Sequence, residues 1–216
     1  RGLWTTLTES AEWSGRSDHS SVVLPDGSIV LMGGGKNDVW RSTDSGATWE
    51  VMTANAAWPA RSGHSSVVLP DGSIVIMGGK LSSSGSSYMN DVWRSTDKGA
   101  TWTQMTPGAG WSGRYGHTSV VLPDGSIVLM GGWDDGYKND VWRSIDNGVT
   151  WEQITANAAW SARYRHSSVV LPDGSIVLMG GCSGSYSYMN DVWRSTDGGE
   201  TWTQTAGGWW SGRSGH

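Results

Sequence analysis

The chain has 216 residues, with 15 basic and 20 acidic side chains, a formal net charge of −5, 32 glycines and 16 tryptophans. The acidic balance argues against a nucleic-acid partner, and no apolar run is long enough for membrane insertion. Its single cysteine, Cys182, excludes an internal disulfide and a cysteine-based zinc site, and we expect neither a metal nor a cofactor.

One pattern recurs along the whole chain. The string HSSVVLPDGSIVLMGG begins at His19 and returns with small changes at His64, His117 and His166, and a fifth histidine is His216. Successive histidines are 45, 53, 49 and 50 residues apart. Such a period is typical of repeat architectures. We therefore predict one domain, residues 1–216, with units at about 19–63, 64–116, 117–165 and 166–215.

The first unit shows four strand signals in chain order. Residues 19–24 are followed by Pro25-Asp26-Gly27, which favours a tight turn because proline presets φ and glycine tolerates a positive φ. Residues 28–32 are continuously apolar, as in a strand covered on both faces. The third and fourth signals are residues 38–42 and 48–52. No apolar period of 3.6 residues occurs, so we expect an all-β protein.

Four antiparallel strands repeated at this interval predict the blade of a β-propeller. One blade cannot bury both of its apolar faces, so neighbouring blades must stack around an axis. The tryptophans agree with this arrangement, since 14 of the 16 fall on three positions of the repeat. We interpret these large aromatic side chains as wedges between blades.

The strand count leaves more than one way to close the ring. The fourth strand type occurs five times, because an extra outer strand at residues 3–8 precedes the first unit. We expect a compact four-bladed ring in which residues 3–8 or 201–205 complete the last blade and cover its edge. The alternatives are half of an eight-bladed ring made by two chains, or a piece of a longer array. The protein would then be a monomer, or a homodimer through the redundant terminal strand.

Two motifs carry a family resemblance. A Gly-Gly doublet followed by Asn-Asp-Val-Trp resembles the kelch repeat, and four S-x-D-x-G-x-T-W segments resemble the Asp box of sialidase-like (BNR) propellers. The resemblance implies a propeller, favours a secreted or cell-surface location, and leaves function open, because both families include enzymes, lectins and scaffolds. It also implies a structural role for the Asp-box aspartates, which are Asp44, Asp97, Asp146 and Asp197.

The loops after the second and fourth strands share one face, because strands alternate in direction. The loop between the glycine doublet and the Asn-Asp pair has 2, 10, 6 and 8 residues in the four units, and all six tyrosines lie on this face. Tyrosine-rich loops on a rigid frame are typical of recognition surfaces. The alternative is that these are unselected, solvated loops. The candidate ligand-binding residues are Tyr88, Tyr115, Trp133, Tyr137, Tyr164, Tyr186 and Tyr188.

An Arg-x-x-His sequence stands at the start of each inner strand. Four such histidines around an axis would suit a metal ring, but nearby arginine charges disfavour a cation, and a residue present in every unit serves the unit. We therefore expect polar contacts between blades. The residues concerned are Arg16, His19, Arg61, His64, Arg114, His117, Arg163 and His166.

The sequence thus predicts a non-catalytic repeat scaffold or binding module that presents variable Tyr/Ser/Gly loops to a glycan or protein. One alternative is an engineered or purely structural propeller without a natural ligand. A sialidase-like glycosidase is less favoured, because nine of the eleven arginines sit on two repeated positions. An active site on a propeller needs residues that break the symmetry of the repeats.

Overall fold

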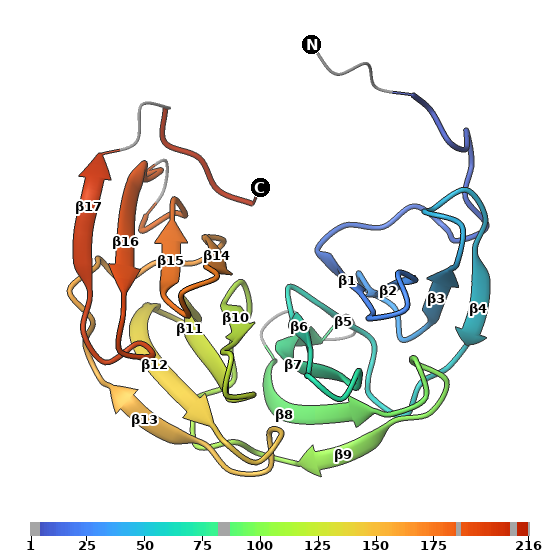
Figure 1. Ribbon diagram of the computed structural model, residues 1–216, viewed down its shortest axis with the longest axis horizontal. Helices are drawn as coiled ribbons and strands as arrows, with labels where there is room; N and C mark the ends of the chain where they lie inside the picture. Colours follow the sequence, from blue (N-terminus) through green and yellow to red (C-terminus); the bar gives the residue numbers. More distant parts are fainter. Residues whose placement is uncertain (1–4, 82–86, 185–186, 208–210, 216) are drawn as a thin grey trace.

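The computed structural model consists of strands and turns arranged as four sheets around an axis (Figure 1). It describes residues 5–81, 87–184, 187–207 and 211–215. Within these ranges there is no helix, and therefore none long and apolar enough to span a membrane. The all-β prediction is confirmed.

Each sheet is an antiparallel blade whose strands follow one another in chain order from the axis outward, except that in the second blade two short inner strands pair with the same neighbour. The first blade contains β1 (His19–Val23), β2 (Ile29–Gly33), β3 (Val39–Ser42) and β4 (Glu50–Thr53). The second contains β5 (Arg61–Ser62), β6 (Ser65–Val68), β7 (Ile74–Leu81), β8 (Tyr88–Ser95) and β9 (Thr103–Thr106). The third contains β10 (Thr118–Val121), β11 (Ile127–Trp133), β12 (Tyr137–Ser144) and β13 (Glu152–Thr155). The fourth contains β14 (Ser167–Val170), β15 (Ile176–Met179), β16 (Asp191–Ser195) and β17 (Thr203–Gly207).

The Pro-Asp-Gly turns join the first two strands of every blade as the sequence predicts. In the first blade Gly27 has φ +82°, and the Leu24 amide donates to the Ser28 carbonyl at 2.8 Å. The Asp26 carboxylate accepts the Ser28 amide at 3.0 Å, which fixes the turn from its side chain. This turn sets the register in which Val23 faces Ile29.

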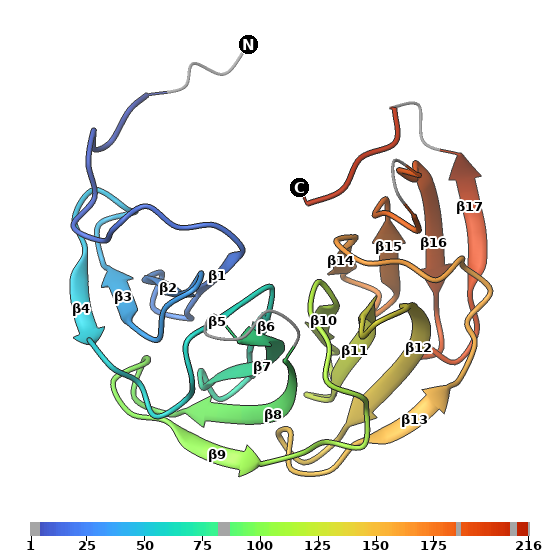
Figure 2. The same ribbon diagram turned by 180° about the vertical axis from the view of Figure 1, so that it is seen from behind.

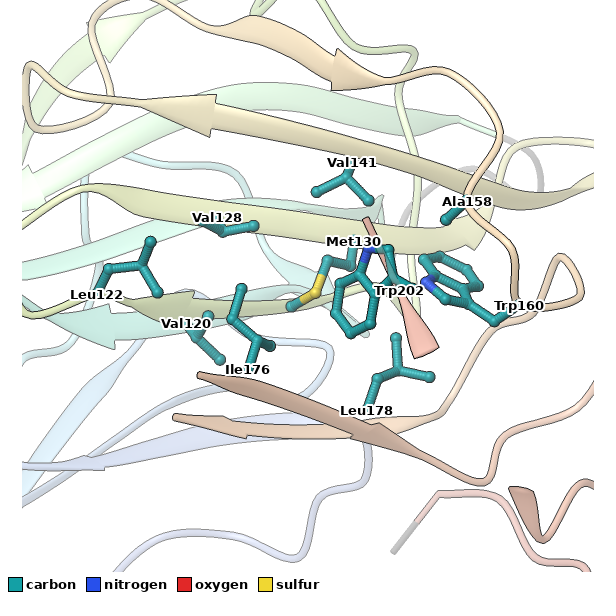
Figure 3. Close-up of a cluster of buried hydrophobic side chains, with 10 residues drawn as sticks. All are labelled: Val120, Leu122, Val128, Met130, Val141, Ala158, Trp160, Ile176, Leu178 and Trp202. Carbon is teal, nitrogen blue, oxygen red and sulfur yellow. The ribbon is translucent and has the colours of Figure 1, made fainter. Parts of the chain in front are cut away.

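The core is divided among the contacts between neighbouring blades. The described residues form three buried apolar clusters, one between each successive pair of blades. Figure 3 shows the cluster between the third and fourth blades, where Val128 and Met130 from β11 meet Ile176 and Leu178 from β15. Alternate residues of the second strand therefore serve opposite interfaces. This double burial explains the continuous apolar run in the sequence.

A pair of tryptophans wedges each interface. Trp160 is fully buried and meets Trp202 edge to face, with ring centroids 6.0 Å apart and planes at 86°. The pairs Trp58–Trp102 and Trp111–Trp151 repeat this geometry at the other two interfaces. Edge-to-face contacts add to the free energy gained by burying these rings. The predicted wedge role is confirmed for these tryptophans.

The fourth blade is completed by its own outer strand. Of the two strands expected to do so, β17 pairs with β16, whereas residues 5–8 lie in no strand and residues 3–4 fall outside the described residues. The arc of blades is open between the first and the fourth blade, on the side where both ends of the chain lie (Figures 1 and 2). The expected compact closure of the four blades is thus not the arrangement seen.

Candidate functional site

The Gly-Gly doublet and the inner-strand histidine form a lock between blades. The His117 ring from the third blade lies over Gly78 of the second, where an added Cβ would come within 2.8 Å of the ring. Its Nε2 is 2.9 Å from the Ser65 hydroxyl. His64 and His166 make the corresponding contacts with the preceding blades through Ser20 and Thr118. Gly78 also has φ +61°. Glycine is therefore favoured there for two reasons, the close approach of the His117 ring and the left-handed backbone conformation.

The arginine of the Arg-x-x-His sequence links two blades: its backbone bonds to the preceding blade, as the Gly79 amide donates to the Arg114 carbonyl at 2.8 Å, and its side chain bonds within its own blade. Arg114 donates to both oxygens of Asp140, at 2.6 and 2.8 Å, and to the Gly131 carbonyl at 2.9 Å. Trp142 Nε1 donates to the same carboxylate at 2.8 Å. The equivalent ion pairs are Arg16–Asp38, Arg61–Asp91 and Arg163–Asp191. A bidentate pair of this kind clamps the segment before each inner strand onto the third strand.

Asp-box aspartates organise the turns on the opposite face. Asp44 accepts the Thr48 amide at 2.9 Å and the Thr48 hydroxyl at 2.7 Å, and these hydrogen bonds lower its pKa to about 2. Thr101, Thr150 and Thr201 make the same contacts with Asp97, Asp146 and Asp197. All four carboxylates are thus occupied with backbone and hydroxyl donors of their own turns.

The variable loops extend two hairpins beyond the glycine doublet. After a register shift at Gly79, Lys80 of β7 pairs with Tyr88 of β8. The corresponding shift in the third blade leads to pairing of Trp133 with Tyr137. Such shifts increase local twist and re-aim the side chains that follow. The two hairpins therefore carry three of the predicted ligand-binding aromatics toward the same surface.

An unbroken aromatic cluster forms on this face. Tyr164 lies at its centre, with ring centroids 5.8 Å from Tyr115, 5.7 Å from Tyr137 and 6.2 Å from Trp133. Tyr88 stacks on Tyr115 at 5.4 Å and 21°. We call these five residues the aromatic cluster. Its rings are half-buried, so their orientations are held while part of each ring meets solvent.

A cavity of about 290 Å³ adjoins the aromatic cluster. Tyr137, Tyr164, Tyr188 and Arg165 line it, together with Cys182, whose thiol donates to the Gly184 carbonyl at 2.8 Å. Burial and the neighbouring Cys182 and Tyr164 raise the pKa of Tyr137, so its hydroxyl stays protonated at physiological pH. The surface of the cavity is thus mainly polar, although three tyrosine rings contribute to its walls.

Two cations lie over tyrosines of the cluster. The Arg165 guanidinium is 5.7 Å from the Tyr164 ring centroid, and the Lys80 ammonium is 6.0 Å from that of Tyr115. Arg165 also forms an exposed ion pair with Asp18 at 2.9 Å. Arg165, Lys80, Asp18 and Cys182 are site residues that the sequence analysis did not select. Their signal was that each departs from the residue found at the same position in the other units.

Six of the seven predicted ligand-binding residues are thus brought together: the five of the aromatic cluster, and Tyr188, which is 51% exposed beside the cavity. The seventh, Tyr186, lies outside the described residues. His19, at the open side, is exposed, and Arg16 takes part in the clamp described above. Among the residues that the structure describes, no three His, Cys, Asp or Glu side chains are grouped as a metal site would need.

This fold and its repeated motifs define a kelch-type β-propeller whose blades also carry Asp boxes. The chain belongs to the kelch-repeat family: residues 2–173 match the family model described as the KLHDC2/KLHL20/DRC7 Kelch-repeats domain. Residues 193–204 match the BNR/Asp-box repeat. The prediction of a kelch propeller with Asp boxes is therefore confirmed.

A similar fold is found in the solved structure of YjhT. The two chains superpose with a TM-score of 0.75 at 16% identity, over 94% of this chain and 68% of that one. An identity this low shows a common fold only. No curated protein sequence matches the chain. Kelch-repeat propellers commonly bind protein partners, so membership of this family suggests a binding or scaffold module.

Proposed function

We propose that this chain is a non-catalytic recognition module that binds a protein partner through the aromatic cluster and the adjoining cavity. The observation that carries the proposal is the convergence of aromatic rings from three blades on one surface, centred on Tyr164. The repeated features, namely the Pro-Asp-Gly turns, the histidine locks, the arginine clamps and the Asp boxes, hold the blades together or fix their turns. This surface, in contrast, differs from unit to unit. Tyrosine and tryptophan offer large contact area at low conformational entropy cost, and they dominate protein-binding hot spots.

The size of the cavity favours a protein over a small molecule. About 290 Å³ lies at the lower limit for sites that enclose a small ligand, so it suits one anchoring side chain of a larger partner. The aromatic cluster extends the contact area beyond this cavity. Arg165 and Asp18 supply charges beside it, which favour correct orientation more than affinity.

A binding role is also supported by the carboxylates near the aromatic cluster, which are already paired with cationic side chains. Asp18 is paired with Arg165, and Asp134 is paired with Lys138 at 2.8 Å. Acid–base catalysis requires a carboxylate or histidine positioned to exchange protons with a substrate. Three of the inner-strand histidines, His64, His117 and His166, are instead held in the locks between blades.

The test is selection from a phage-displayed peptide library on the immobilised chain, with a glycan array probed in parallel. We expect enriched peptides whose affinity, measured by calorimetry, falls about tenfold or more in Tyr164→Ala. Ile145→Thr is the matched control, because Ile145 is 82% exposed on an Asp-box turn and threonine stands there in the other units.

Three results would contradict the proposal. Saturable glycan binding that is lost in Tyr164→Ala would assign the aromatic cluster to carbohydrate. Failure of both libraries to yield a ligand would leave a structural propeller. Turnover of a fluorogenic glycoside would make the chain an enzyme.

A further inference from the structure

A second surface lies on the outer side of the propeller, where the third and fourth blades meet. It is a groove of about 470 Å³. Trp151, Glu152 and Ile154 line it from the third blade, and Glu200 lines it from the Asp-box turn of the fourth. The Thr155 hydroxyl lies 3.0 Å from the Glu200 carbonyl oxygen and donates to it, which holds this turn against β13. We call the surface formed by Trp151, Glu152, Ile154 and Glu200 the outer groove.

The outer groove and the aromatic cluster lie at opposite ends of β12. Tyr137 begins this strand within the aromatic cluster, whereas Arg143, near its other end, lies beside the outer groove. An extended strand rises about 3.3 Å per residue, so roughly 20 Å separates these two positions. A side chain bound in the outer groove therefore makes no contact with the aromatic cluster.

The outer groove breaks the symmetry of the repeats through its two glutamates. The corresponding residue pairs are Glu50 and Ala100 between the first and second blades, and Thr103 and Val149 between the second and third. Only between the third and fourth blades does the sequence place an acidic residue at both positions, Glu152 and Glu200. A feature that holds the blades together recurs in the other units, as the Asp boxes do. This pair of carboxylates is therefore not required for packing of the blades.

The two carboxylates give the outer groove an excess of negative charge. Glu152 and Glu200 are both exposed, and neither forms an ion pair within the described residues. Arg143 lies opposite Glu152 across the strand pair, but its guanidinium is paired with Asp124. The charges of Arg143 and Asp124 offset each other, so those of Glu152 and Glu200 remain uncompensated.

The outer groove suits one long side chain with a positive charge. Trp151 and Ile154 are partly buried, so they offer apolar walls beside the carboxylates. Lysine and arginine combine an apolar stem with a charged end and therefore match both parts. Because the carboxylates face solvent, each ion pair formed there contributes a factor of about five or less in affinity. A free amine gains little from them, whereas a protein adds contacts around the groove.

We propose that the outer groove is a docking surface for a partner protein, which inserts one lysine or arginine side chain between Glu152 and Glu200. The stem of that side chain packs on Trp151 and Ile154, and the two carboxylates complement its charge. Where the aromatic cluster also holds a partner, the chain connects the two. The outer groove shares no residue with the aromatic cluster, so the inference does not depend on the proposed function.

The experiment uses four pools of short peptides, in which the central residue is lysine, arginine, norleucine or glutamate and the other positions vary. Each pool is titrated into the isotope-labelled chain, and binding is followed by two-dimensional NMR. We expect the lysine and arginine pools to shift the amide signals of Trp151, Glu152 and Glu200, and the glutamate pool to leave them in place. The apparent affinity of the two basic pools should exceed that of the norleucine pool about fivefold or more, and it should fall as the salt concentration rises.

Substitutions taken from the other units test the two carboxylates without disturbing the fold. Glu152→Thr introduces the residue type found at the same position as Thr103, and Glu200→Ala introduces the type found as Ala100. Each variant should lower the affinity for the lysine pool about two- to fivefold and leave the melting temperature unchanged. Glu50→Thr is the matched control, because it makes the same exchange in the first blade, and it should leave the affinity unchanged.

Four results would overturn the proposal. The first is a norleucine pool that binds as tightly as the lysine pool, and the second is an affinity that survives removal of both glutamates. The third is n-butylammonium binding as tightly as the lysine pool, which would make the groove a site for small amines. The fourth is the absence of any shift at the outer groove. Shifts confined to Tyr164 and its neighbours would place the peptides on the aromatic cluster, which supports the proposed function and removes this inference.

Discussion

Asp18 and Arg165 form an ion pair at 2.9 Å although 147 positions separate them, and they join the segments that lead into the first and fourth blades. Both residues have φ near +53°, whereas glycine stands at the same position in the other units, as at Gly63 and Gly116. Backbone hydrogen bonds link these positions in a chain, in which Gly63 donates to Asp18 at 2.8 Å and Arg165 donates to Gly116 at 2.7 Å. The two side chains therefore occupy a backbone conformation that favours glycine.

The first prediction separates the side chain of Arg165 from its backbone. Arg165→Ala and Arg165→Gly both remove an exposed ion pair worth about 0.2–1 kcal/mol. Only glycine also relieves the left-handed conformation, which costs about 1–2 kcal/mol for other residues. We expect Arg165→Gly to melt about 2–8 °C above Arg165→Ala by calorimetry. Equal melting temperatures would mean that the backbone at this position is unstrained.

A second prediction concerns the buried clamp. Arg114→Ala leaves the Asp140 carboxylate, which is 8% exposed, without its cation. We expect a loss of about 3–5 kcal/mol in the free energy of unfolding, measured by urea titration. The control is Arg143→Ala, which removes the more exposed pair with Asp124 and should change stability by at most about 1 kcal/mol. Similar losses in the two variants would contradict the clamp.

The glycine doublet gives a third prediction. At Gly131, φ is +60°, and a Cβ would lie 2.9 Å from the His166 ring and 3.0 Å from the Arg163 carbonyl. Gly131→Ala should therefore lose about 2–4 kcal/mol, from backbone strain together with overpacking. Gly136→Ala is the control, since nothing lies within 4 Å of its Cβ position. If both variants melted with the wild type, the histidine lock would have no steric basis.

Acid should weaken the interfaces through their histidines. Burial, together with the Arg114 charge, lowers the pKa of His117 to about 3, and burial with the Arg61 charge holds the pKa of His64 well below 6.5. The unfolded chain takes up these protons first as the pH falls below 6.5. Stability should then drop by at most about 1.4 kcal/mol per pH unit for each of these two histidines.

The measurement for this fourth prediction is urea unfolding between pH 7 and pH 4. His117→Asn should show a smaller slope than the wild type over this range, even though it starts from lower stability. A variant slope as steep as that of the wild type would place the responsible protons on other groups.

The fold was largely predictable because its rules are local. Each of the patterns used depends on a few residues that are close in sequence, and each recurs in every unit, which makes it easier to recognise. These patterns are the Pro-Asp-Gly turns, the continuously apolar second strand and the recurring tryptophans. The spread of the arc was not predictable in this way, because the angle between blades depends on how side chains such as Trp160 and Trp202 pack. Closure of four blades was expected, and the arc is open.

The candidate site was predictable only in part. Alternation of strand direction placed the tyrosines on one face, but the contact of Tyr164 with Tyr115 and Trp133 depends on how adjacent blades meet. Arginine and histidine three positions apart suggested one shared role. Their side chains instead diverge, so Arg114 bonds within its blade and His117 bonds to the preceding one. The Asp18–Arg165 pair could not be found from local patterns, since it joins distant units.

The lock between Gly78 and His117 has a consequence for how such a protein diversifies. Each repeat carries both the glycine that contacts the histidine of the next repeat and the histidine that contacts the glycine of the preceding one. Duplication of a whole repeat therefore creates a complete contact between blades without any new mutation. The aromatic cluster includes neither the glycine nor the histidine of these contacts. Substitutions in the aromatic cluster leave the contacts between blades intact, so new binding specificities can arise on duplicated repeats that already pack together.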